Sequence, residues 1–197
     1  MRYKAEHKVE TRRRVLAEAA RSIRTSGPDR VSVAEIMSGA GLTHGAFYAH
    51  FKSKDALVAG AIDEMFNDAR RRLARSTADG SPAEGLARYI DFYLSTQHRD
   101  ARGTGCPLPA LSADLARLGP EARVRYGEGV DSLTRRLADT LALMGRGGAE
   151  AEAASVVAEL VGAVALARAV SDPQQSDSIL AASRTALRRR LNLEIAP

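Results

Sequence analysis

The segment that decides the fold comprises residues 33–54, VAEIMSGAGLTHGAFYAHFKSK. It contains two short stretches with helical spacing of apolar residues, and a glycine-bearing turn at 38–41 separates them. Ser32 and Glu35 have the spacing of a capping box, which predicts where the first helix begins. Thr43 is the expected N-cap of the second helix. Two brief helices joined by such a turn are typical of a helix-turn-helix unit.

Helical periodicity extends over the rest of the 197 residues, and we expect an all-α fold. The chain has 5% aromatic residues and no Trp, a composition that favours helices over strands. Clusters of Gly, Pro, Ser and Asp mark the breaks between nine expected helices. These cover about residues 6–25, 33–38, 43–51, 54–76, 82–97, a short stretch after 107, 120–144, 149–170 and 176–191.

Positive charge is concentrated at the N-terminal end of the chain. Residues 1–54 hold 11 Lys and Arg against 5 Asp and Glu, a net charge of +6, whereas residues 55–197 hold 18 against 19, a net charge of −1. Such an excess can neutralise DNA phosphates, or it can form a basic solvated helix face. The helix-turn-helix pattern favours DNA.

Several function classes find no support in the sequence. A single cysteine, Cys106, excludes an internal disulfide framework and a Cys-rich zinc site. No secretory signal or membrane-length apolar run is present, so we expect a soluble, cytoplasmic protein. The four histidines lack metal-ligand spacing, and no phosphate loop or nucleophile elbow occurs. We therefore expect no cofactor, no metal and no enzymatic activity.

The segment resembles the signature of the TetR family of bacterial transcriptional regulators. The resemblance includes the turn glycine, the Thr-X-Gly start of the second helix, the Phe-Tyr-X-His-Phe end and the Lys-Ser-Lys-Asp that follows, and it extends over about residues 9–66. It implies a helix-turn-helix DNA-binding domain at 1–54 and a ligand-binding and dimerisation domain at 55–197. It also implies that the ligand-occupied form releases DNA.

The second helix of such a unit lies in the major groove, with its first residues against base edges. Thr43 and His44 lie there and can donate or accept hydrogen bonds, and Gly45 permits close approach of the backbone. Tyr48 and the basic residues after it suit phosphates. The predicted DNA-contacting residues are Ser32, Val33, Thr43, His44, Gly45, Tyr48, His50, Lys52 and Lys54.

Some of these residues have a structural alternative. Tyr48 and His50 can instead be polar groups satisfied within the core. Phe47 and Phe51 are assigned to the core. Family members often carry an aromatic residue where this chain has Ala49, a departure that removes one expected backbone contact.

The candidate effector-binding residues are Tyr89, Phe92, Tyr93 and Gln97, which share one helix at helical spacing, together with Cys106. Aromatic rings with polar groups suit a ligand pocket, but the same stripe can be ordinary core. Cys106 precedes Pro107 where a short helix begins, a place that can favour a reactive thiolate and hence a sensor of electrophiles. The alternative is a small apolar residue buried under the loop.

Residues 149–170 are apolar most of the way round, with Val156, Leu160 and Val164 among them. Together with apolar residues of 176–191, namely Ile179, Leu180, Ala186, Leu187 and Leu191, they resemble the homodimer interface of the TetR family, a four-helix bundle, and we expect the same interface here. An intramolecular hairpin is the alternative. The arginine runs 70–72 and 188–190 are interpreted as solvated helix faces.

The leading functional hypothesis is a dimeric repressor that binds a pseudo-palindromic operator in double-stranded DNA and is released by a small molecule. The alternatives are a ligand-independent DNA binder or activator, a thiol-based electrophile sensor acting through Cys106, and an enzyme with a vestigial DNA-binding end. The sequence does not identify the effector, the operator or the regulated genes.

Overall fold

A computed structural model describes residues 2–193, and within them the chain forms nine α-helices, three short 3-10 helices and no strand. The expected all-α class is confirmed. The elements are α1 (Arg2–Ser26), α2 (Val33–Gly39), η1 (His44–Ala49), α3 (Lys54–Ser76), α4 (Pro82–Tyr93), α5 (Thr96–Asp100), η2 (Arg102–Thr104), α6 (Pro107–Leu111), η3 (Leu115–Arg117), α7 (Pro120–Leu143), α8 (Ala149–Ala169) and α9 (Pro173–Arg190).

Serine caps fix the starts of three consecutive helices. The Ser32 hydroxyl accepts from the Glu35 amide while the Glu35 carboxylate accepts from the Ser32 amide, which is the expected capping box at α2. Ser81 and Glu84 form the same reciprocal pair at α4. At α3 the Ser53 hydroxyl accepts from the Ala56 amide at 3.1 Å. These caps satisfy backbone donors that a helix start leaves unpaired.

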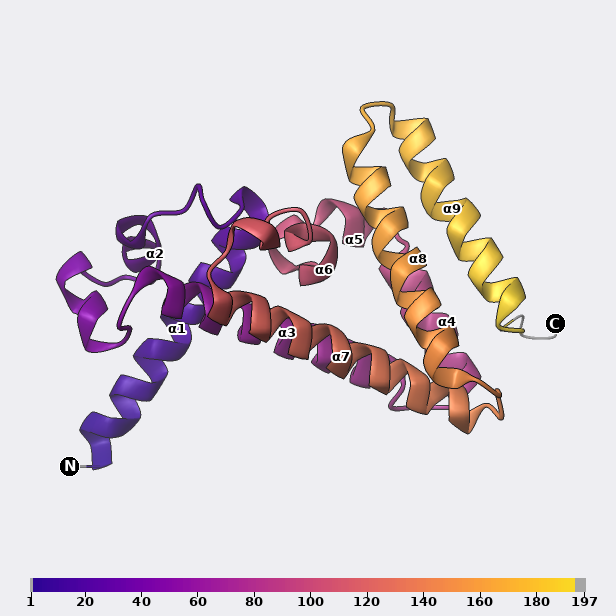
Figure 1. The fold of residues 1–197 in the computed structure, drawn as a ribbon, viewed down its shortest axis with the longest axis horizontal. Helices are drawn as coiled ribbons and strands as arrows, with labels where there is room; N and C mark the ends of the chain where they lie inside the picture. Colours follow the sequence, from indigo (N-terminus) through magenta and orange to yellow (C-terminus); the bar gives the residue numbers. More distant parts are fainter. Residues whose placement is uncertain (1, 194–197) are drawn as a thin grey trace.

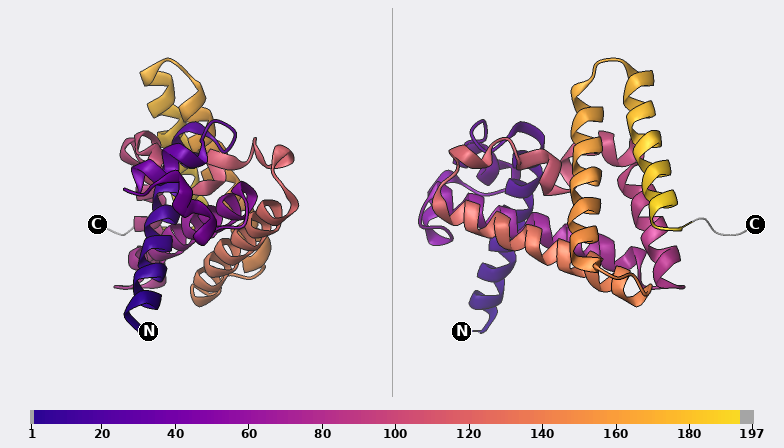
Figure 2. Two further views of the ribbon diagram at one scale, coloured as in Figure 1. Left: turned by 90° about the vertical axis from the view of Figure 1, so that its left-hand side faces the viewer. Right: turned by 45° about the vertical axis from the view of Figure 1, so that its right-hand side comes forward.

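The helices form an elongated molecule with two ends (Figure 1). The elements α1, α2 and η1 gather at one end, and the α8–α9 hairpin stands beside α4 at the other. Between them, α3 and α7 lie side by side along most of their length, as the rotated views of Figure 2 also show. Helix α3 therefore belongs structurally to both ends.

The crossing of α3 and α7 depends on the absence of a side chain. Gly129 of α7 is buried, and a Cβ built there would lie 2.2 Å from the ring of Phe66 on α3. The Phe66 ring is fully buried and meets Tyr126 edge-on, with 5.5 Å between ring centroids. Glycine at this position lets the two long helices approach closely, so they form one layer of the core.

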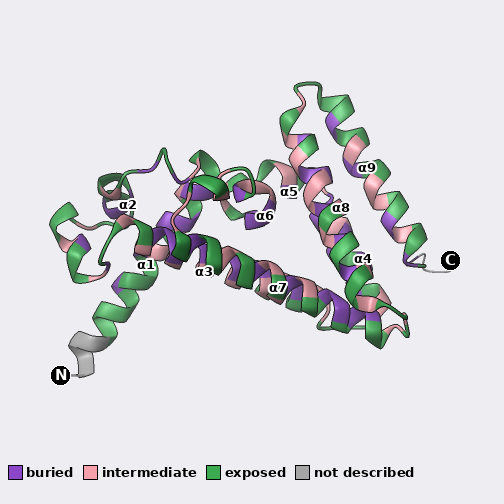
Figure 3. Ribbon diagram, viewed as in Figure 1, coloured by how far each residue is buried: buried purple, intermediate pink, exposed green. Residues whose placement is uncertain are grey.

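The hairpin of α8 and α9 buries one side and leaves the other open (Figure 3). Three of the expected interface residues, Leu180 and Leu187 of α9 and its C-cap Leu191, are buried inside the chain, as are Val156, Leu160 and Val164 of α8. Their assignment to a dimer interface is therefore wrong, because they already pack within the monomer. The outer side of α8 instead presents Leu166, which is 60% exposed, and several alanines.

Two sequence-based boundaries also differ from the structure. The helix expected over 82–97 ends at Tyr93, because Ser95 caps a separate helix, α5, by accepting from the His98 amide. The second helix of the helix-turn-helix is a 3-10 helix, and the Thr43 side chain makes no capping hydrogen bond. The 3-10 geometry is common in such short pieces. Within residues 2–193 no helix is both long and apolar enough to cross a bilayer.

Candidate functional site

The turn between α2 and η1 is held by the backbone and by one arginine of α1. Gly41 has a φ of +71°, a left-handed conformation that glycine adopts without strain, and its amide donates to the Ser38 carbonyl. The Arg14 guanidinium of α1 donates to the carbonyl of Ala40. The turn is thus fixed to α1, which sets the angle at which η1 projects.

Two aromatic rings hold η1 against the core. Phe47 and Phe51 are 2% and 3% exposed, and their rings stack with 5.7 Å between centroids. Their assignment to the core is confirmed. Because they turn one side of η1 inward, the other side faces solvent, where Thr43, His44 and Tyr48 are exposed.

The exposed side of η1 carries no acidic residue, and two lysines follow it in the chain. Residues 36–54 contain no Asp or Glu. Lys52 is exposed, Lys54 is half-buried at the start of α3, and a Cβ at Gly45 would meet nothing within 4 Å. We call residues 36–54 the acid-free segment; it presents polar groups and positive charge on a projecting helix.

Three predicted contact residues lie in less open positions. Ser32 is exposed, but its hydroxyl is used in the capping box, and Val33 is half-buried. His50 is half-buried, and its Nδ1 is buried without a hydrogen-bond partner. Burial, followed by the nearby Lys8 and Arg12, lowers the pKa of His50. The alternative in which His50 is satisfied by the core therefore finds no partner in the structure.

Two adjoining cavities lie beside α3, among α4, α5, the η2 loop, α6, α7 and α8. The first, the polar cavity, has a free volume of about 10 Å³ and is lined by Asp68, Ala69, Arg72, Tyr89, Phe92, Tyr93, His98, Thr104, Gly105 and Cys106. The second, the apolar cavity, also has a free volume of about 10 Å³ and is lined by Tyr89, Tyr93, Cys106, Leu108, Leu133, Leu137, Val157, Leu160 and Val161. Three side chains are therefore common to both.

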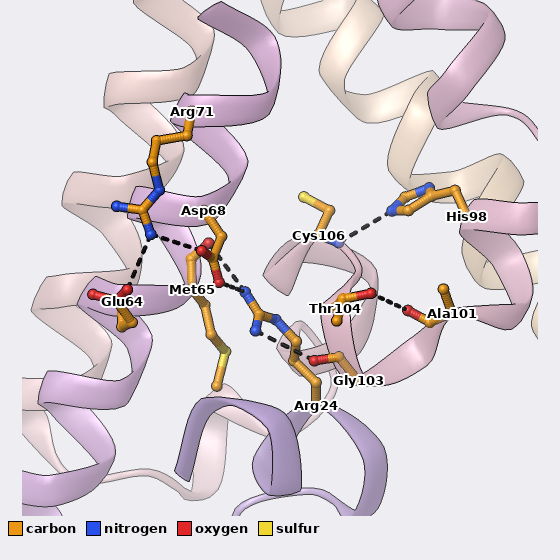
Figure 4. A network of polar contacts seen from close by, with 10 residues as sticks. All are labelled: Arg24, Glu64, Met65, Asp68, Arg71, His98, Ala101, Gly103, Thr104 and Cys106. Carbon is orange, nitrogen blue, oxygen red and sulfur yellow. Dashed lines mark hydrogen bonds and ion pairs between the residues drawn. The ribbon is translucent and has the colours of Figure 1, made fainter. Parts of the chain in front are cut away.

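A buried arginine connects the wall of the polar cavity with α1 (Figure 4). Arg24 donates to Asp68 at 3.0 Å, to the Met65 carbonyl at 3.3 Å and to the Gly103 carbonyl at 3.4 Å. The other carboxylate oxygen of Asp68 accepts from Arg71 at 2.7 Å. One side chain of α1 is thus bonded to α3 and to the η2 loop beside the cavity.

His98 and Cys106 also line the polar cavity. The His98 ring bonds to the Tyr93 carbonyl through Nδ1 at 2.7 Å, and its Nε2 accepts from the Cys106 amide at 3.1 Å. This pairing requires a neutral ring, and burial lowers the pKa of His98 to about 4. The Cys106 thiol is buried, and burial raises its pKa. These properties contradict the prediction of an accessible sensor thiol with a low pKa. They agree with the alternative, in which Cys106 is a small residue buried under the loop.

The predicted pocket residues are only partly brought together. Tyr89, Phe92, Tyr93 and Cys106 line the cavities, whereas Gln97 is exposed on α5, outside them. Sequence reasoning missed Arg24, Asp68, Arg72, His98 and Thr104. Arg24 carried a signal, since it lies four residues after the buried Ala20 on the apolar face of α1.

A helix-turn-helix at one end of an all-α body is typical of DNA-binding proteins. Residues 15–61 match the model described as bacterial regulatory proteins, tetR family. This part of the chain is therefore similar to the TetR family of regulators. Among residues 2–193 no group of acidic, His and Cys side chains is arranged to hold a metal ion.

Individual relatives agree with this family. The HTH-type transcriptional repressor DhaR of Mycobacterium sp. (strain GP1) is 30% identical over 94 residues, which are 47% of this chain and 46% of DhaR. The A-factor receptor protein of Streptomyces griseus is 28% identical over 133 residues, which are 66% of this chain and 44% of the receptor. The matches thus span less than half of these curated relatives. A TetR regulator from Chloroflexus aurantiacus is 25% identical, with a TM-score of 0.79 over 95% of this chain and 96% of its own.

Proposed function

We propose that the chain is a transcriptional repressor that binds a pseudo-palindromic operator as a dimer and is released by a small-molecule effector. Residues 1–54 would bind DNA, and residues 55–197 would bind the effector and the second subunit. The observation that carries the proposal is the acid-free segment on η1, which projects from the body while two phenylalanines anchor its other side. The repressor role is supported by the similarity to DhaR, a transcriptional repressor.

Within the acid-free segment, Thr43, His44 and Gly45 would contact base edges, since they lie at the start of the projecting helix η1. Tyr48, with 74% of its surface exposed, and the lysines Lys52 and Lys54 would meet phosphates. Ser32, Val33 and His50 would lie at the margin of the contact.

A dimer is proposed because one short helix reads too few base pairs to select a site in a genome. The outer faces of α8 and α9 would form the interface, and Leu166 would lie in it.

Release by an effector is proposed from the position of Arg24. A ligand that moved Asp68 or the Gly103 loop would disturb the hydrogen bonds of Arg24 and hence the seat of α1. Because Arg14 of α1 also holds the turn before η1, the change would reach the DNA-binding surface.

The test is fluorescence anisotropy with duplexes selected from random DNA by the purified full chain. We expect two subunits per duplex and half-site centres roughly 34–36 Å apart or a small multiple of that. Light scattering that finds a monomer at micromolar concentration, with one chain per bound duplex, contradicts the dimeric mode. Selection that returns no preferred sequence contradicts operator binding altogether.

A further inference from the structure

The chemistry of the two cavities limits what the effector can be. The polar cavity and the apolar cavity adjoin at Tyr89, Tyr93 and Cys106, so that a single ligand in both would have one polar and one apolar end. Each cavity has a free volume of only about 10 Å³, the room of about one water. A ligand therefore binds here only as the lining side chains move apart.

Arg72 is a cation in the wall of the polar cavity without an anionic partner. Its guanidinium lies 4.2 Å above the centroid of the Phe92 ring, an arrangement that fixes a cation but does not neutralise it. Among the described residues no carboxylate forms an ion pair with Arg72, whereas Arg24, Arg71 and Arg99 each have such a partner.

The one acid in this wall, Asp68, does not offset that charge. Its two oxygens are occupied by Arg24 at 3.0 Å and by Arg71 at 2.7 Å. His98 is neutral in its bonded state. The polar cavity therefore has an excess of positive charge, which favours an anion over a cation.

A second, independent feature lies where the cavities meet. The Tyr93 hydroxyl is buried without a hydrogen-bond partner, in a side chain only 3% exposed. The Cys106 thiol is nearby, but a thiol is a weak partner. A buried hydroxyl left unsatisfied costs free energy, and it is a donor available to a ligand oxygen at the boundary between the polar and the apolar end.

We propose that the effector is a small amphipathic carboxylic acid, bound as its anion, an inference that rests on the effector-released repressor proposed above. Its carboxylate accepts hydrogen bonds from the Arg72 guanidinium and the Tyr93 hydroxyl. Its short alkyl or aryl body enlarges the apolar cavity as it binds and packs among Leu108, Leu133 and Leu160. Arginine suits this role because its planar guanidinium matches the two oxygens of a carboxylate.

The experiment measures binding to the full chain without DNA by calorimetry, using matched probes. The panel consists of straight-chain monocarboxylates of increasing length and of phenylacetate and 3-phenylpropanoate, each paired with its primary amide and its amine. We expect at least one acid to bind with a dissociation constant below about 1 mM and at least about tenfold more tightly than its amide. The corresponding amine binds more weakly than either.

Variants distinguish the contribution of Arg72 to ligand binding from that of Tyr93. Arg72→Gln reduces the acid-to-amide ratio to within about threefold of unity, Arg72→Lys keeps part of it, and Arg75→Gln, an exposed arginine of the same helix, leaves it unchanged. Tyr93→Phe weakens binding of the acid about three- to tenfold. It lowers the melting temperature of the free protein little, because the only neighbour of the hydroxyl is the weakly bonding Cys106 thiol.

The outcomes are distinguishable from a failure of the proposed function. The inference is wrong if no acid binds, if an amide binds as tightly as its acid, or if Arg72→Gln and Arg75→Gln have the same effect. An acid that binds through Arg72 but leaves operator affinity unchanged refutes effector release and leaves the ligand class standing. A neutral molecule that binds in these cavities and releases DNA refutes the carboxylic-acid class and supports effector release.

Discussion

Replacement of Arg24 by methionine should destabilise the protein more than the same replacement of any exposed arginine of α1. Methionine keeps the apolar stem but removes three hydrogen bonds, to Asp68 and to the carbonyls of Met65 and Gly103. The Arg24 side chain is 3% exposed, whereas that of Asp68 is 44% exposed and keeps Arg71. Hydrogen bonds to charged groups contribute about 1.5–3 kcal/mol each when buried. The bonds to the two carbonyls are long, at 3.4 and 3.3 Å, and Asp68 regains water, so we expect a total loss close to that of one such bond, about 1.5–3 kcal/mol.

Urea denaturation followed by circular dichroism measures this loss, at one protein concentration because dimerisation would shift the midpoint. Arg21→Met is the matched control, since the Arg21–Glu18 pair lies one turn away and its arginine is 62% exposed. It should cost less than about 0.5 kcal/mol. A double-mutant cycle with Asp68→Asn should give a coupling energy of about 0.5–1.5 kcal/mol. Equal losses for the two arginine variants, or a coupling energy near zero, would refute the assigned role of Arg24.

Three further changes test other parts of the structure. Gly129→Ala should lower the free energy of unfolding by about 1–3 kcal/mol through overpacking, whereas Gly127→Ala, with open space around its Cβ, should raise it by up to about 1 kcal/mol, both read from urea midpoints. Lys54→Ala should weaken binding to all DNA and reduce its salt dependence, whereas His44→Ala should mainly reduce discrimination between operator and random duplex; the same uniform loss for both contradicts their roles. The pKa of His98 is lowered to about 4, so its contribution to the free energy of unfolding should be fully present above pH 6.5. The free energy of unfolding should fall by up to about 3 kcal/mol as the pH decreases toward 4. A His98→Asn variant whose free energy of unfolding has the same pH dependence would exclude His98 as the cause.

Local signals made the helix starts predictable from the sequence. The capping boxes at Ser32 and Ser81 and the cap at Ser53 depend on side chains one turn away, so spacing alone identifies them. The inward assignment of Phe47 and Phe51 was predictable for the same reason, since the two rings are one helical turn apart.

Long-range contacts explain most of what the sequence did not reveal. Arg24 meets Asp68 across 44 positions, and no periodicity indicates that a charged residue is buried by such a partner. Whether Leu187 packs within the chain or against another subunit is decided by neighbouring helices. Gln97 was misplaced because Ser95 begins a new helix inside a stretch whose apolar spacing continues.

The length of α3 has a mechanical consequence. Its first residue, Lys54, adjoins the DNA-binding surface, and Asp68 lies 14 positions further on in the cavity wall, a separation of about 21 Å along a helix. A tilt of about 5° pivoting at Asp68 would therefore move Lys54 by about 2 Å. If the effector moves Asp68 as proposed, α3 would act as a lever, and α7 would move with it because the two helices pack closely at Gly129. In a dimer, opposite tilts of the two α3 helices would change the distance between the two η1 helices by about 4 Å. A hydrogen bond to a base edge tolerates a much smaller displacement.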